Sequence, residues 1–176
     1  MRWLFAISLL IAELAVAGPT DRKLESPAMM ERLATLLSAR RLDAIAAQVP
    51  DEPDAFVAAL FYPGSQILVI SGRSSAPRAL LDRLSWKQYR NIYLDLQSGP
   101  VPNTTWFLYD MGADGLPAKR EQPVDTLYDA DQAAAIFDGD WKKHELSEKA
   151  YGDLLSTADA RYSRLLAALI QEAQRP

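Results

Sequence analysis

The sequence predicts an α+β domain, with an antiparallel or mixed sheet of about four to six strands covered by an N-terminal helix and a pair of C-terminal helices. Two observations support this fold class. Apolar residues recur at helical spacing near both ends of the chain, whereas the middle holds short apolar runs bounded by glycine and proline. The connections are too short for repeated strand–helix–strand crossovers, except at residues 73–90. That single crossover leaves a small α/β fold open as the alternative.

Length and composition bound the domain organisation and exclude several kinds of site. The chain has 176 residues, of which 49% are hydrophobic, which suits one globular domain with a substantial core. Its formal net charge is -4, so no basic surface for duplex nucleic acid is expected. The lack of cysteine and the single histidine exclude disulfides, thiolate sites and multi-histidine metal sites.

Residues 1–17 have the pattern of a secretory signal peptide. Arg2 supplies the positive charge, an apolar run follows, and the small residues Ala15 and Ala17 stand where a signal peptidase cleaves. The apolar run is short for a membrane span, which needs about 20 residues. We therefore expect a periplasmic or secreted single domain over residues 18–176, with no stable membrane span after cleavage. Retention of the segment as an anchor is the alternative.

The N-terminal helix is expected to begin at Ser26 and Pro27, because a serine hydroxyl caps free N–H groups and proline suits the first turn. Its apolar stripe consists of Met29, Leu33, Leu36 and Leu37. After Arg40 the stripe resumes on a rotated face, so we expect the helix to bend or restart. This second stripe consists of Leu42, Ile45, Ala46 and Val49. Prolines in residues 50–54 then end the helix.

The centre of the fold is expected at residues 66–72, a run rich in β-branched side chains that predicts a strand buried on both faces. Residues 56–62 precede it across a Pro-Gly turn and form either its hairpin partner or a short helix. A short helix is expected over residues 77–84, followed by an antiparallel hairpin of strands 91–97 and 104–111.

Shorter elements complete the chain. Residues 112–115 and 138–140 are expected to form turns, residues 126–128 a brief strand, and residues 133–137 a strand or a helical turn. Two helices are expected at the C-terminus. The first is capped by Ser147, and the second is capped by Ser156 and Thr157 and carries the broad apolar stripe that ends at Ala173.

A candidate anion site lies at Arg73, Ser74 and Ser75, at the end of the central strand and just before a predicted helix. Backbone N–H groups, hydroxyls and a guanidinium can together hold a phosphate or carboxylate there. Trp106 belongs to a group of aromatic residues that could line a pocket for a flat ligand. The alternatives are an exposed connection with a capping serine, and aromatic side chains that only pack in the core.

Other motifs point to no specific chemistry. Residues 110–115 and 138–140 place carboxylates in turns, but neither segment matches the EF-hand pattern for calcium. His144 stands in a polar segment, and no serine elbow or glycine-rich phosphate loop occurs. We therefore assign no catalytic residues and no metal ligands.

A buried strand from Leu68 to Ser71 is followed by Arg-Ser-Ser, a small helix, the strand from Tyr93 to Leu96 and the segment from Trp106 to Asp110. This succession resembles part of the FMN-binding split-barrel group, the pyridoxamine-phosphate-oxidase-like proteins. The resemblance implies that Arg73, Ser74 and Ser75 match the strand-end positions that hold the flavin phosphate. The short glycine-turned hairpins usual in that family are missing here.

The sequence thus predicts a non-enzymatic, exported domain that binds an unknown protein or a small anionic ligand and carries no cofactor. The alternative is a split-barrel-like protein that binds FMN or another small cofactor near Arg73 and Trp106.

Overall fold

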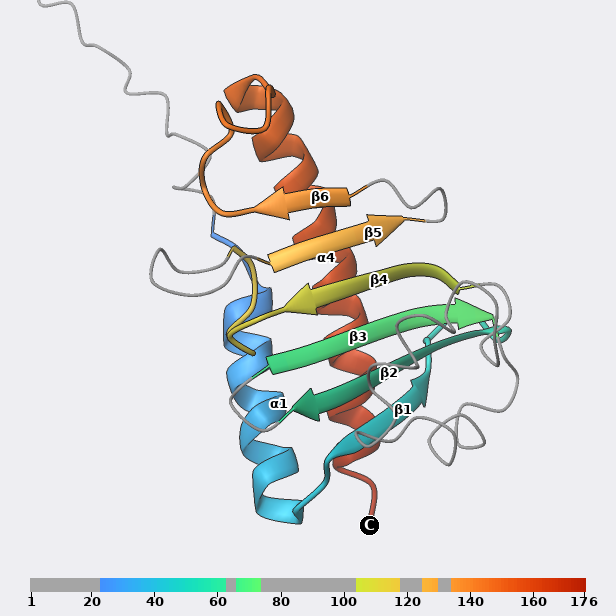
Figure 1. Ribbon diagram of the computed structural model, residues 1–176. Coiled ribbons are helices and arrows are strands. Elements are labelled where there is room, and N and C mark those ends of the chain that lie inside the picture. The colour runs from blue at the N-terminus through green and yellow to red at the C-terminus, as the bar shows by residue number, and fades with distance from the viewer. Residues whose placement is uncertain (1–22, 63–65, 74–103, 118–124, 130–133) are drawn as a thin grey trace, which may run out of the picture.

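A six-stranded antiparallel sheet forms the centre of the molecule, and two helices, α1 and α4, cover one of its faces (Figure 1). This computed structural model describes residues 23–62, 66–73, 104–117, 125–129 and 134–176. The strands follow one another across the sheet in chain order, and every described pair is antiparallel. The predicted α+β class is confirmed, in its antiparallel form.

The described elements are α1 (Ser26–Arg40), β1 (Ala44–Gln48), β2 (Ala55–Tyr62), β3 (Gln66–Arg73), β4 (Thr104–Asp110), β5 (Asp125–Asp129), β6 (Ala134–Phe137) and α4 (Glu148–Ala173). The predicted strands at 104–111 and 126–128 are therefore confirmed, and of the two alternatives for residues 133–137 the structure has the strand, β6. The predicted signal peptide, the helix at 77–84 and the strand at 91–97 lie outside the described residues.

The hairpin of β2 and β3 is buried on both faces, as the sequence predicts. Val57, Ala59, Ile67 and Val69 join the core beneath the helices. The residues that alternate with them are also fully or almost fully buried, namely Phe56, Ala58, Leu60, Leu68 and Ile70. Residues 56–62 thus form the hairpin partner of β3, rather than a short helix.

The predicted continuation of the first helix into residues 42–49 is wrong, because that segment contains β1. Arg41 adopts a left-handed conformation (φ 55°), and the N–H of Leu42 donates to the carbonyl of Leu37, which closes the helix. Beyond this point Ile45 and Ala47 alternate into the core and pair with β2. The alanines among these residues favour a helix, but pairing with β2 outweighs that local preference.

The two predicted C-terminal helices are one continuous helix, α4. Ser147 caps it as expected, since its hydroxyl accepts a hydrogen bond from the N–H of Ala150 (3.1 Å). Ser156 and Thr157 are not caps. Their hydroxyls donate to the carbonyls of Gly152 and Asp153, one turn earlier in the same helix. This bonding satisfies a serine or threonine in the interior of a helix without ending it.

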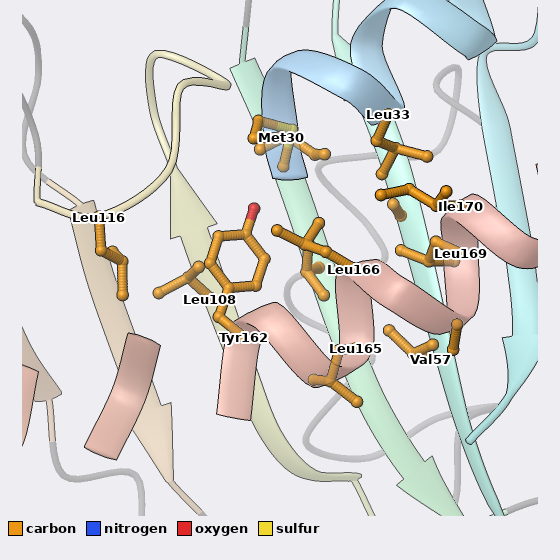
Figure 2. Packing of buried hydrophobic residues seen from close by; sticks show 14 of the residues in the cluster. Met30, Leu33, Val57, Leu108, Leu116, Tyr162, Leu165, Leu166, Leu169 and Ile170 are labelled. Carbon is orange, nitrogen blue, oxygen red and sulfur yellow. The ribbon is translucent and has the colours of Figure 1, made fainter. Parts of the chain in front are cut away.

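The core lies between the helices and the sheet. Figure 2 shows Met30 and Leu33 of α1 close to Leu166 and Ile170 of α4, and the ring of Tyr162 beside Leu108 of β4. All five of these aliphatic side chains are at most 5% exposed, and Tyr162 is fully buried. This packing fixes α4 against the sheet, and it thereby sets which helix residues reach the sheet's edge.

Candidate anion-binding pocket

A pocket of about 370 Å³ lies between α4 and the part of the sheet where β1 ends and β3 nears its end. Its lining residues come from three separate segments of the chain. They are Val49, Glu52, Ser71, Ala160, Arg161, Arg164 and Leu165.

The fold brings these segments together because each one is anchored in the core. Val49 follows β1 and is 3% exposed, and Leu165 of α4 is equally buried. Ser71 of β3 stands opposite Trp106 of β4 in the sheet register. Residues 160, 161 and 164 lie within about one turn of α4, so they share a side of the helix.

Arg161 is the central cation of the pocket. Its guanidinium carbon lies 5.3 Å from the centroid of the Trp106 ring, which is itself 4% exposed. Desolvation lowers the pKa of Arg161, while the negative charge of Glu52 acts in the opposite direction. The guanidinium nevertheless stays charged at neutral pH. Within the described parts of the chain, no carboxylate forms an ion pair with it.

Arg164 differs from Arg161 because it has a carboxylate partner. Its guanidinium forms an ion pair with Glu52, which stands in the turn between β1 and β2. The Arg164 side chain is 61% exposed and the Glu52 side chain 50% exposed. An ion pair so accessible to water contributes little to stability, but it places a negative charge at the pocket.

Two of the four predicted site residues, Arg73 and Trp106, are among the described residues. Trp106 packs in the core, 6.4 Å from the Tyr162 ring between centroids, with Arg161 over its face. Arg73 is the last residue of β3, two positions after the pocket residue Ser71, and its backbone pairs with Ala55. Ser74 and Ser75 lie outside the described residues.

Sequence reasoning missed Arg161, Arg164 and Glu52. The arginines are three residues apart on the polar side of a helix, a pattern typical of any solvated helix face. Glu52 follows Pro50 in a turn, where acidic residues are ordinary. Only the packing of α4 on the sheet brings the glutamate to the arginines.

A second polar cluster is buried beneath the loop that follows β4. The carboxylate of Asp110 accepts hydrogen bonds from the N–H groups of Asp114 (3.0 Å) and Gly115 (2.9 Å) and from the hydroxyl of Tyr162 (3.0 Å). Asp125 accepts only one, from the N–H of Met111 (3.0 Å). Its Oδ2 is buried and has no hydrogen-bond partner among the described residues.

These two aspartates therefore differ in charge. Burial, followed by the charge of Asp110, raises the pKa of Asp125 to about 8, so Asp125 carries a proton at neutral pH. Burial also raises the pKa of Asp110, against the effect of its three donors. Because those donors stabilise the ionised form, we place the negative charge on Asp110 and the proton on Asp125.

His144 has a carboxylate partner that the sequence could not identify. Its Nε2 lies 2.9 Å from Oδ1 of Asp138, which also accepts a hydrogen bond from the N–H of Asp140. The predicted turn at 138–140 is thus held together by Asp138. Across the described ranges, no group of acidic or histidine side chains has the arrangement needed to hold a metal ion.

Comparisons with protein-family models, curated proteins and solved structures gave no match to this chain. In the regions where helices are described, neither α1 nor α4 is long and apolar enough to cross a membrane.

Proposed function

We propose that this protein is an exported, non-enzymatic binding domain whose pocket beside α4 holds a small anionic ligand. The observation that carries the proposal is the state of Arg161. Arg161 is an exposed residue whose guanidinium lies over a buried indole ring, and no described carboxylate forms an ion pair with it, although the charge of Glu52 acts on it. A bound anion would supply that missing partner.

The chemistry of the pocket supports an anion as the ligand. A guanidinium presents a planar fork of donors that matches a carboxylate or a phosphate group. The hydroxyl of Ser71 stands in the same lining and can donate a further hydrogen bond. The volume of about 370 Å³ lies within the range of roughly 300–1,000 Å³ that is typical of small-molecule sites.

FMN remains the alternative ligand. The pocket lies next to the end of β3, where Arg73 stands. Arg73 is one of the strand-end positions that the split-barrel resemblance associates with the flavin phosphate, so an FMN site would overlap the pocket. FMN therefore belongs among the anions to be tested.

The proposal is tested by ligand-dependent thermal stability. Acetate, benzoate, inorganic phosphate and FMN are each added to the wild-type domain at constant ionic strength. A ligand at about 100 times its Kd should stabilise the native state by about 2.7 kcal/mol, which is read as a rise in Tm. Arg161→Gln should abolish that rise, because the fork of charged donors is lost.

Arg32→Gln is the matched control. Arg32 is an exposed residue of α1 outside the pocket lining, so its replacement removes the same charge without touching the site. This variant should keep the full rise in Tm. The proposal is overturned if no anion stabilises the wild type, or if Arg161→Gln responds as strongly as Arg32→Gln.

A further inference from the structure

We infer that the pocket selects a monocarboxylate with a small apolar body over phosphate and dicarboxylates. This inference rests on the proposed function and adds the class of ligand. It is drawn from the charge balance of the lining, the shape of the free donor group and the apolar wall beside it.

The charge balance favours a single negative charge on the ligand. The lining holds two arginines and one glutamate, and Glu52 already pairs with Arg164. One positive charge, that of Arg161, is left for a ligand. A second negative charge on the ligand would meet the carboxylate of Glu52, and like charges at close range repel.

The free donor group matches a carboxylate. Two parallel N–H groups of a guanidinium bind the two oxygens of one carboxylate, which gives the strongest geometry for this kind of pair. Phosphate is a dianion over much of the neutral pH range. A site with one net positive charge therefore leaves part of the charge of the phosphate uncompensated. The single free arginine thus favours the carboxylate.

The remaining lining favours an apolar body. Val49, Ala160 and Leu165 have aliphatic side chains; Val49 and Leu165 are each 3% exposed, whereas Ala160 is exposed. A ligand that covers Ala160 gains from the removal of apolar surface from water. The volume of about 370 Å³ is at the lower end of the usual range for ligand sites, so the body must be small. An aromatic ring or a short branched chain meets these conditions.

Glu52 is the residue that sets this selectivity, and its removal should abolish the preference for a single negative charge. In Glu52→Gln the pair with Arg164 is lost, and the lining then carries two uncompensated arginines. Because that pair is exposed and contributes little to stability, the variant should fold. We expect it to bind dianions more tightly than the wild type does.

The experiment measures the binding of four probes by calorimetry: benzoate, its neutral counterpart benzamide, the dicarboxylate phthalate and inorganic phosphate. The wild type should bind benzoate but not benzamide. It should bind benzoate about tenfold more tightly than phthalate, because the second carboxylate of phthalate is repelled by the half-exposed Glu52. Glu52→Gln should raise the affinity for phthalate and phosphate by about tenfold and change that for benzoate less. Glu31→Gln, which removes an exposed charge on α1, should keep the wild-type pattern.

The outcomes separate this inference from the function on which it rests. If no anion binds, or if binding does not need Arg161, the proposed function itself fails. If anions bind through Arg161 but the wild type prefers phosphate or phthalate, only the selectivity is overturned. An unchanged ratio of benzoate to phthalate affinity in Glu52→Gln would also overturn it.

Discussion

Gly115 shows how a single backbone position joins the sheet to α1. It has a φ of 81°, and a Cβ atom built there would lie 2.4 Å from the backbone N of Pro27. A side chain would therefore meet both an unfavourable backbone conformation and the first turn of the helix. The loop after β4 can approach α1 so closely only because this residue is glycine.

We predict that Gly115→Ala lowers the free energy of unfolding by more than about 2 kcal/mol, because the left-handed conformation and the clash both add to the cost. Urea denaturation measures the loss. Gly139→Ala is the control, since Gly139 has a similar φ of 79° but no atom within 4 Å of the added Cβ. It should lose only about 1 kcal/mol. Equal losses in the two variants would contradict the role of the close approach.

Ser26 shows why a residue's role can differ from the one its type predicts. The sequence predicts correctly that the helix begins here, but the predicted hydroxyl cap is wrong. The Ser26 hydroxyl instead accepts a hydrogen bond from the N–H of Leu116 (2.9 Å) and so ties the loop after β4 to α1. The start of α1 is instead capped by the carboxylate of Asp159, which is more than a hundred positions away in the chain. No local pattern reveals this contact.

Among the elements, α1 and α4 satisfy free backbone groups at each other's ends. The carboxylate of Asp159 accepts hydrogen bonds from the N–H groups of Glu25 (2.9 Å) and Ser26 (3.0 Å), at the start of α1. Arg40, at the end of α1, donates to the carbonyls of Ala173 (2.6 Å) and Arg175 (2.8 Å). Free N–H groups at one end and free carbonyls at the other are thus satisfied by charged partners.

We predict that Asp159→Ala lowers the free energy of unfolding by at least about 1 kcal/mol. Asp159 is 5% exposed, and its loss leaves two N–H groups without their acceptor. Unfolding in urea measures the change, and circular dichroism reports any loss of helix. Asp153→Ala, in the same helix, is the control. Asp153 takes part in an exposed ion pair with Lys149 and should contribute less than about 1 kcal/mol. A cost for Asp159→Ala as small as that of the control would contradict the capping role.

At the scale of the whole molecule, the buried aspartates make stability depend on pH. The pKa of Asp125 is about 8 in the folded protein and near the ordinary 3.8 when unfolded. Its contribution is therefore complete below about pH 4 and is lost as the pH rises through 8, because the unfolded chain ionises first. Asp110, whose pKa is also raised, acts in the same direction.

We predict that the free energy of unfolding falls from pH 5 to pH 8, by up to about 1.4 kcal/mol per pH unit from the one proton on Asp125. Asp125→Asn should make this slope much shallower, because an amide does not ionise and can still accept from Met111. Urea denaturation at several pH values measures both slopes. Asp51→Asn, at an exposed aspartate, should keep the wild-type slope. The assignment of the proton to Asp125 is contradicted if Asp125→Asn keeps that slope as well.

Asp138 does not interfere in this range. Its pKa is lowered, because hydrogen bonds from Asp140, His144 and Lys143 outweigh the effect of burial. It therefore contributes stability above about pH 4 and loses it only at lower pH. Asp138 therefore adds nothing to the slope between pH 5 and pH 8.

The sequence alone left residues 56–62 open between a strand and a short helix. It was sufficient for the fold class, the buried strand at residues 66–72 and the cap at Ser147. Each follows from a local pattern: β-branched runs around a Pro-Gly turn, or a hydroxyl just before a helix. The arginines and the glutamate of the candidate pocket were not accessible in this way, because they come together only in the folded chain. Local patterns suffice where the stabilising contacts come from neighbours in the chain or from simple periodicity.

Only the tertiary structure decided that residues 44–48 form a strand, that α4 is a single helix, and that Asp159 caps α1. It also decided that Glu52 meets Arg164 while Arg161 lies over Trp106. These features depend on contacts between segments far apart in sequence, whose free energies outweigh local propensity. A residue pattern compatible with two structures, such as the alanine-rich run after Arg41, is resolved only by what packs against it.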